Sequence, residues 1–175
     1  MPTPTYTLIQ AVTVGAGGAS SIDFTSIPST YTDLCLMISN RTTRATYNDY
    51  LKIGFNGTTT NITYRSLEGN GASASSFTES AAAQFIGEAN ADTSTSNTFD
   101  SFQIYLPNYA GSNNKSYSVD SVTENNVSGT NSAFANLTAG LWSSSSAITS
   151  IKITPGIATT IKQYSTAYLY GIVNS

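Results

Sequence analysis

The chain has 175 residues, a formal net charge of −3, no histidine and one cysteine. Without an imidazole, it lacks the base or ligand of a Ser-His-Asp or Cys-His catalytic system, of the usual zinc site and of a histidine-bound haem. Charged residues make up only 10% of the chain, and the seven Lys and Arg residues are scattered, which argues against nucleic acid as a partner.

The length suits one domain with a single hydrophobic core that needs neither metal nor disulfides. Serine and threonine occupy 52 positions, so hydroxyl groups rather than charges supply the polar surface. No apolar run approaches the roughly 20 residues that span a bilayer, and no export signal is evident, so we expect no membrane partner. Cys35 lies in an apolar run and is predicted to be a buried, unreactive thiol.

Strand patterns begin near the N-terminus, where β-branched and aromatic residues prevail from residue 5 to residue 14. A glycine-rich turn follows at 15–20. It lacks the spacing of a dinucleotide-binding loop, and a short strand at 22–24 comes directly after it. Residues 33–39, DLCLMIS, form a continuous apolar run, which is typical of a strand buried between two layers.

Strict alternation of apolar and polar residues gives the clearest strand at 50–57, where Leu51, Ile53 and Phe55 share one face. A second alternating strand spans 101–109. Further strands are predicted at 64–67, 115–122, 147–154 and 166–173.

Between residues 69 and 97 the sequence becomes small and polar, which predicts the longest loop region of the chain. Within it, residues 79–86 could form one or two helical turns, and 84–87 could equally be a strand. In total, about eight to ten strands separated by turn signals predict an all-β single domain, an antiparallel β-sandwich of the jelly-roll type.

Paired carboxylates are the one acid–base system that remains open, because glycoside hydrolysis needs two carboxyl groups roughly 5 to 9.5 Å apart. The nearest pairs in the sequence are Glu88 with Asp92 and Asp120 with Glu124, and solvated loop carboxylates are the simpler interpretation. No calcium-loop pattern is present. We therefore expect a protein that is not an enzyme and that holds no metal or cofactor.

Tyrosines indicate a different kind of site, because phenol rings pack on sugars and equally fill subunit interfaces. The candidate sugar-binding residues are Tyr47, Tyr50, Tyr105, Tyr109 and Tyr117. Two prolines near the N-terminus resist regular structure, so residues 1–7 are expected to form an extended arm before a domain at 8–175. The candidate interface combines this arm with loop arginines and aromatic residues: Pro2, Pro4, Tyr6, Arg41, Arg44, Tyr47, Tyr105, Tyr109 and Trp142.

Five segments follow one another along most of the chain: IDFTSIPSTYTDLCLMIS at 22–39, YLKIGFNG at 50–57, FQIYLPNYAGSNNKSY at 102–117, ITSIKITP at 148–155 and AYLYGI at 167–172. In this succession the chain resembles a β-sandwich module that is common in the virion proteins of tailed phages. Such modules occur in capsid decoration (cement) proteins and in tail-fibre or receptor-binding proteins. The resemblance carries over no catalytic residues.

The resemblance implies a structural role in the virion. Because the module is short and has no shaft or attachment domain, we expect a decoration protein on the outer surface of the capsid. It would be made in the host cytoplasm, form a homotrimer, bind the major capsid protein and stabilise the lattice. The alternative is a tail-fibre or receptor-binding module that recognises host-surface carbohydrate.

Overall fold

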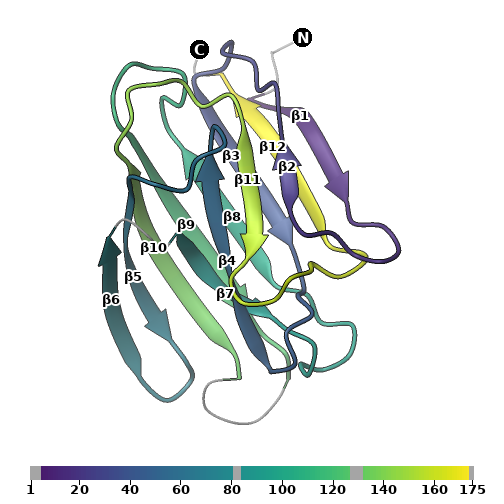
Figure 1. Ribbon diagram of the computed structural model, residues 1–175. Helices are drawn as coiled ribbons and strands as arrows, with labels where there is room; N and C mark the ends of the chain where they lie inside the picture. The colour runs from purple at the N-terminus through teal and green to yellow at the C-terminus, as the bar shows by residue number, and fades with distance from the viewer. Residues whose placement is uncertain (1–4, 81–83, 127–131, 174–175) are drawn as a thin grey trace.

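Every element of the described chain is a β-strand, as the sequence predicts. The computed structural model describes residues 5–80, 84–126 and 132–173. In these ranges it contains twelve strands and no helix, and its two antiparallel sheets face each other as a single-domain β-sandwich (Figure 1). The same ranges therefore hold no helix that could cross a membrane.

The two sheets differ in width. The larger has eight strands, in the spatial order β1 (Tyr6–Thr13), β12 (Thr166–Ile172), β3 (Asp33–Ser39), β8 (Ser101–Leu106), β9 (Lys115–Thr123), β10 (Phe134–Trp142), β5 (Ile62–Gly69) and β6 (Ala74–Ser80). The smaller has four, in the order β2 (Ile22–Phe24), β11 (Ile151–Pro155), β4 (Asn48–Phe55) and β7 (Phe85–Asn90).

Eight of the strands pair in a nested order. With β5, β6, β9 and β10 set aside, the first strand pairs with the last, β1 with β12, and the second with the second-last, β2 with β11. Inside these, β3 pairs with β8 and β4 with β7. This is the eight-stranded jelly roll, in which one long antiparallel hairpin is rolled into two facing sheets. The predicted jelly-roll sandwich is thus confirmed.

The remaining four strands are insertions that widen one sheet. β5 and β6 lie between β4 and β7 in the chain, and β9 and β10 lie between β8 and β11. Because β10 pairs with both β9 and β5, these strands extend the larger sheet beyond β8 (Figure 1). The insertions raise the strand number above the predicted eight to ten.

The region 69–97 is not one long loop, because it contains β6 and β7. Of the two alternatives for its middle part, the strand is correct: β6 ends at Ser80 and β7 begins at Phe85, while residues 81–83 lie outside the described residues. The prediction failed here because β6, ASSFTES, is exposed at most positions and has no apolar alternation to mark it.

The core lies between the two sheets and follows the predicted alternation. Leu51, Ile53 and Phe55 of β4 are buried together. The Phe55 ring faces Tyr117 of β9 and Trp142 of β10, with ring centroids 5.6 and 5.4 Å apart. These large rings join the smaller sheet to the larger one and bury much of the apolar area that stabilises the fold.

The close approach of the sheets at β7 depends on Gly87. Its φ of +140° is one that L side chains rarely adopt, and the β4–β7 register shifts beside it, between Leu51 and Lys52. A Cβ at this position would collide with the Ser121 hydroxyl of β9 and lie 2.9 Å from Phe102 Cε1 of β8. The larger sheet can therefore pack against β7 because residue 87 has no side chain.

We expect Gly87→Ala to lower the free energy of unfolding by about 2–4 kcal/mol, since the methyl group overpacks the space between the sheets and strains the backbone. Urea denaturation followed by circular dichroism measures this loss. Gly15→Ala is the matched control, because nothing lies within 4 Å of a Cβ at that position. Equal stabilities of the two variants would contradict the packing described for β7.

Candidate functional site

Most of the exposed large apolar side chains lie on the outer face of the eight-stranded sheet, the face that points away from the smaller sheet. In β8, β9 and β10 burial alternates strictly, so every second side chain points outward. Of the thirteen large apolar side chains exposed in the described residues, nine lie on this face: Tyr6, Leu8, Met37, Leu67, Tyr105, Val122, Leu137, Leu141 and Tyr168.

The strand register places these side chains in rows that cross the sheet. Leu67 of β5 lies opposite Leu137 of β10, which lies opposite Asp120 of β9. Cross-strand neighbours have Cβ atoms about 4.5–5.5 Å apart, so their side chains touch. The same row continues across the sheet through Gln103, Met37 and Tyr168. Asp120 and Gln103 lie between the leucines and Met37 in this row, so the face carries two apolar patches separated by polar side chains. Exposed apolar patches are typical of interaction sites.

One half of the outer face is rich in tyrosine; this tyrosine half comprises the outward side chains of β1, β12, β3 and β8. The Tyr105 hydroxyl donates a hydrogen bond to Asp33 Oδ2 at 2.7 Å, which, together with desolvation, raises the pKa of Tyr105 to about 12. Tyr6 and Tyr170 meet edge to face, 6.1 Å apart. These contacts already restrict the rotation of the rings. Covering the rings with a partner therefore costs little additional side-chain entropy.

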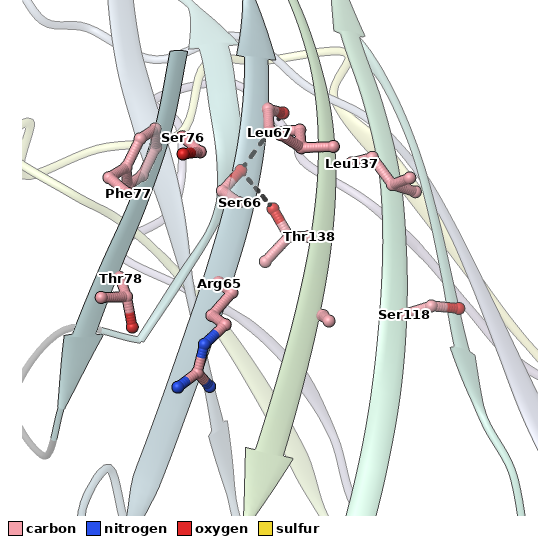
Figure 2. A pocket seen from close by; sticks show the side chains of 10 residues that line it. Arg65, Ser66, Leu67, Ser76, Phe77, Thr78, Ser118, Leu137 and Thr138 are labelled. Atoms are coloured by element: carbon pink, nitrogen blue, oxygen red, sulfur yellow. Dashed lines mark hydrogen bonds between the residues drawn. The ribbon is translucent and has the colours of Figure 1, made fainter.

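The other half carries the exposed leucines; this leucine half comprises the outward side chains of β9, β10, β5 and β6. Leu67 and Leu137 are 59% and 58% exposed. They line an open groove of about 630 Å³, whose other walls include Arg65, Ser118 and Ala139. Figure 2 shows the two leucines at one end of the groove and Arg65 toward the other. The groove therefore combines an apolar floor with a single cation.

The sequence did not predict the leucine half, because β10 has an inverted pattern. Its inward positions include Asn136 and Thr138, which are 4% and 1% exposed, whereas Leu137 and Leu141 point outward. Gly140 also points inward, directly beneath the Tyr117 ring. A strand whose leucines face solvent is a signal for an interface, but the sequence alone does not say which face is covered.

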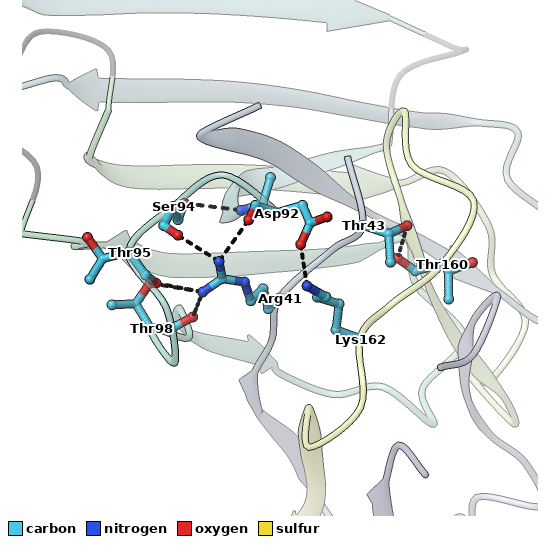
Figure 3. Close-up of polar contacts among 9 residues, drawn as sticks. Arg41, Thr43, Asp92, Ser94, Thr95, Thr98, Thr160 and Lys162 are labelled. Atoms are coloured by element: carbon cyan, nitrogen blue, oxygen red, sulfur yellow. Dashed lines mark hydrogen bonds and ion pairs between the residues drawn. The ribbon is translucent and has the colours of Figure 1, made fainter. Parts of the chain in front are cut away.

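Arg41, a predicted interface residue, is instead a buried anchor for the loop after β7. Its Nη1 donates to the carbonyl oxygens of Thr95 and Thr98 at 2.7 and 3.0 Å, and its Nη2 donates to those of Asp92 and Ser94 at 3.1 and 2.8 Å (Figure 3). The side chain is almost fully enclosed. The two Nη atoms donate to four backbone carbonyls of one loop, so this guanidinium holds the loop in place.

The other predicted interface residues are scattered over the molecule. Tyr6 and Tyr105 lie on the outer face, while Tyr47 is exposed in the β3–β4 loop and Arg44 in the same loop is half-buried. Tyr109 and Trp142 are buried core residues, so they present no side-chain surface to a partner. Pro2 and Pro4 lie outside the described residues, and of the predicted arm at 1–7, Tyr6 and Thr7 belong to β1.

The remaining sugar-site candidates do not gather into one site. Tyr50 is half-buried on β4, and Tyr117 is buried in the core.

The carboxylates of the predicted pairs have different partners and surroundings. Asp92 forms an ion pair with Lys162, and Glu124 caps the following turn by accepting hydrogen bonds from the backbone of Asn125 and Asn126. Asp120 is exposed on the outer face of β9. No group of three or more potential metal-ligating residues occurs in the described part of the chain.

Glu88 has a different neighbour, Glu68, which the sequence did not indicate. Asn136 donates to Glu68 Oε2 at 3.0 Å and accepts the backbone N–H of Glu88 at 3.2 Å, so it links β5 to the free edge of β7. Burial raises the pKa of Glu88 to about 7, with a further increase from the Glu68 and Asp49 charges; a hydrogen bond from Asn48 and the charge of Arg44 oppose the increase. The contacts here are structural links between the sheets.

Comparisons of the chain with models of protein families, with curated proteins and with solved structures find no match.

The raised pKa of Glu88 predicts a stability that falls as the pH rises. Between about pH 4.5 and pH 7 the folded protein keeps a proton that the unfolded chain releases, so the free energy of unfolding decreases through this window. We expect Glu88→Gln to flatten this decrease and to be about 2 kcal/mol more stable than the unmodified protein at pH 8. Urea denaturation at a series of pH values measures both effects.

The exposed Glu124→Gln variant is the matched control, since the amide oxygen can keep the cap that the carboxylate makes. It should retain the full pH dependence. An unchanged pH profile for Glu88→Gln would show that the Glu88 carboxylate is ionised in the folded protein at neutral pH.

Proposed function

We propose that the protein is a structural protein of a phage virion, a capsid decoration (cement) protein that binds outside the major capsid lattice and stabilises it. The observation that carries this proposal is the outer face of the eight-stranded sheet, which holds nine of the thirteen large apolar side chains exposed in the described residues. Covering such a face with another protein removes apolar area from water and is favourable. The resemblance of the sequence to tailed-phage virion modules supplies the context.

The distribution of charge supports a role as a building block. Among the residues of the eight-stranded sheet whose burial the structure describes, only Arg65 and Asp120 are exposed and charged. A partner that covers the face therefore desolvates few ions, which keeps the cost of burial low. The tyrosine half is suited to the capsid, because rings with polar tips are enriched at protein interfaces. Binding only to the assembled lattice would stabilise that lattice by mass action.

A receptor-binding module is the second candidate, and the exposed tyrosines favour it. Tyr105 and Tyr168 are 36% and 37% exposed, and the Gln103 amide lies in the same row as Tyr168. Phenol rings and amides are the groups that pack on and hydrogen-bond to sugars. A glycan array with a clear signal, together with labelling confined to the tail, would select this candidate over the decoration protein.

Virions should carry the protein in high copy over the head, and particles that lack it should lose infectivity faster on heating. Added purified protein should restore the resistance, whereas Tyr168→Glu should need at least about tenfold higher concentration, because the new carboxylate would be buried without a partner. Immunogold labelling and heat-inactivation curves measure these outcomes.

Tyr164→Glu is the matched control for this substitution, since Tyr164 is 69% exposed in the loop before β12 and belongs to no strand of the outer face. It should restore heat resistance like the unmodified protein. Equal heat resistance of particles with and without the protein would contradict the decoration role.

A further inference from the structure

The leucine half of the outer face contains one cation and one anion in a self-complementary arrangement. Arg65 of β5 and Ser118 of β9 both lie opposite Ala139 of β10, on either side of it. Asp120 lies two residues further along β9, opposite Leu137. Both charged side chains are exposed, and neither forms a hydrogen bond or ion pair within the described residues.

A two-fold axis along β10 would pair these charges between two copies. Such an axis places β5 of one copy over β9 of the other, because the two strands flank β10 at equal distances of about 4.8 Å. Arg65 of one copy then faces Ser118 of the other copy. Asp120 of that other copy lies two residues from Ser118, a distance of about 6.6 Å along β9. The long arginine side chain can span this distance, and the symmetry makes the contact twice.

The same axis brings the apolar side chains together at the centre. Leu137 and Leu141 lie on β10 itself, so they meet their equivalents in the second copy along the axis. Face-to-face sheets pack about 10 Å apart with aligned strands, which suits this arrangement. An apolar centre between two desolvated ion pairs is the usual anatomy of a specific interface.

The overlapping area is sufficient for association. About the axis, β8 to β6 overlap with their equivalents, five strands about 4.8 Å apart and about 23 Å long. The footprint is about 550 Å² on each copy, or about 1,100 Å² in total, which exceeds the roughly 1,000 Å² that a specific interface needs. The overlap takes in β8, the edge strand of the tyrosine half, and leaves the outward side chains of β1, β12 and β3 uncovered.

We propose that the leucine half binds a second copy of this chain through a two-fold contact, with Arg65 of each copy paired to Asp120 of the other. The inference rests on the proposed function only in taking the outer face as a protein-binding surface. It assigns the leucine half, with the adjoining β8, to self-association and leaves the β1, β12 and β3 part of the tyrosine half for the capsid.

Charge reversal tests the pairing directly in the purified full-length chain. Arg65→Asp places two acids at each contact and Asp120→Arg places two arginines there, so each variant alone should dissociate at least tenfold more readily. Mixing the two variants restores opposite charges at both contacts and should recover association, as should the double variant Arg65→Asp/Asp120→Arg. Sedimentation equilibrium over a concentration series measures the dissociation constants.

Lys152→Asp is the matched control, because Lys152 is an exposed residue of the smaller sheet whose ion pair with Asp23 is also exposed. It should associate like the unmodified chain. Circular dichroism should show that all variants remain folded, since each substitution lies at an exposed position.

Three outcomes would overturn the inference: a monomer at about 100 μM, a trimer with no even-numbered species, or a mixture of the two charge variants that associates no better than either alone. Labelling of virions distinguishes failure of the two-fold contact from failure of the proposed decoration role. A monomeric chain that decorates heads overturns only the two-fold contact, whereas a dimer absent from heads overturns only the decoration role.

Discussion

The unequal width of the two sheets is the constraint on which the rest of the structure depends. Four strands cannot cover eight, so the inserted strands need other cover for their inner side. An aromatic cluster supplies it at the β7 edge, where Phe85 packs against Tyr50, Tyr64 and Phe77 with ring centroids 5.4 to 5.8 Å apart. Nothing comparable in the described chain covers the opposite side of the wide sheet, which explains why its large apolar residues are exposed.

The low charge content has a structural counterpart in the interior. Arg41 and Lys115 are buried and donate to backbone carbonyls of neighbouring loops, those of Gly111 and Asn113 in the case of Lys115. Asp100 is buried as well and accepts hydrogen bonds from Asn40 and Asn90, although burial still raises its pKa well above the usual range. Several of the few charged side chains therefore hold loops at the ends of the sandwich. The outer face of the larger sheet is left almost neutral.

The sequence predicts those parts of the fold in which apolar alternation and burial agree. Leu51, Ile53 and Phe55 identify β4 because every second residue faces the core. β6 and β10 were missed, since β6 is mostly exposed and the leucines of β10 face solvent. Candidate site residues were harder to predict for the same reason. Residue type indicated that Tyr6 and Tyr105 lie at a surface, but it indicated the same for Tyr109, whose ring is buried in the core.

Nested strand pairing also determines how this chain can fold. The hairpin of β9 and β10 joins neighbouring segments, but β1 pairs with β12 at the opposite end of the sequence. Contacts between distant segments have a high entropic cost of loop closure, so we expect a slow folder in the range of milliseconds to seconds. During synthesis β1 must wait until β12 has left the ribosome. Until then its edge is unpaired, and in that interval the nascent chain is most exposed to aggregation and to chaperones.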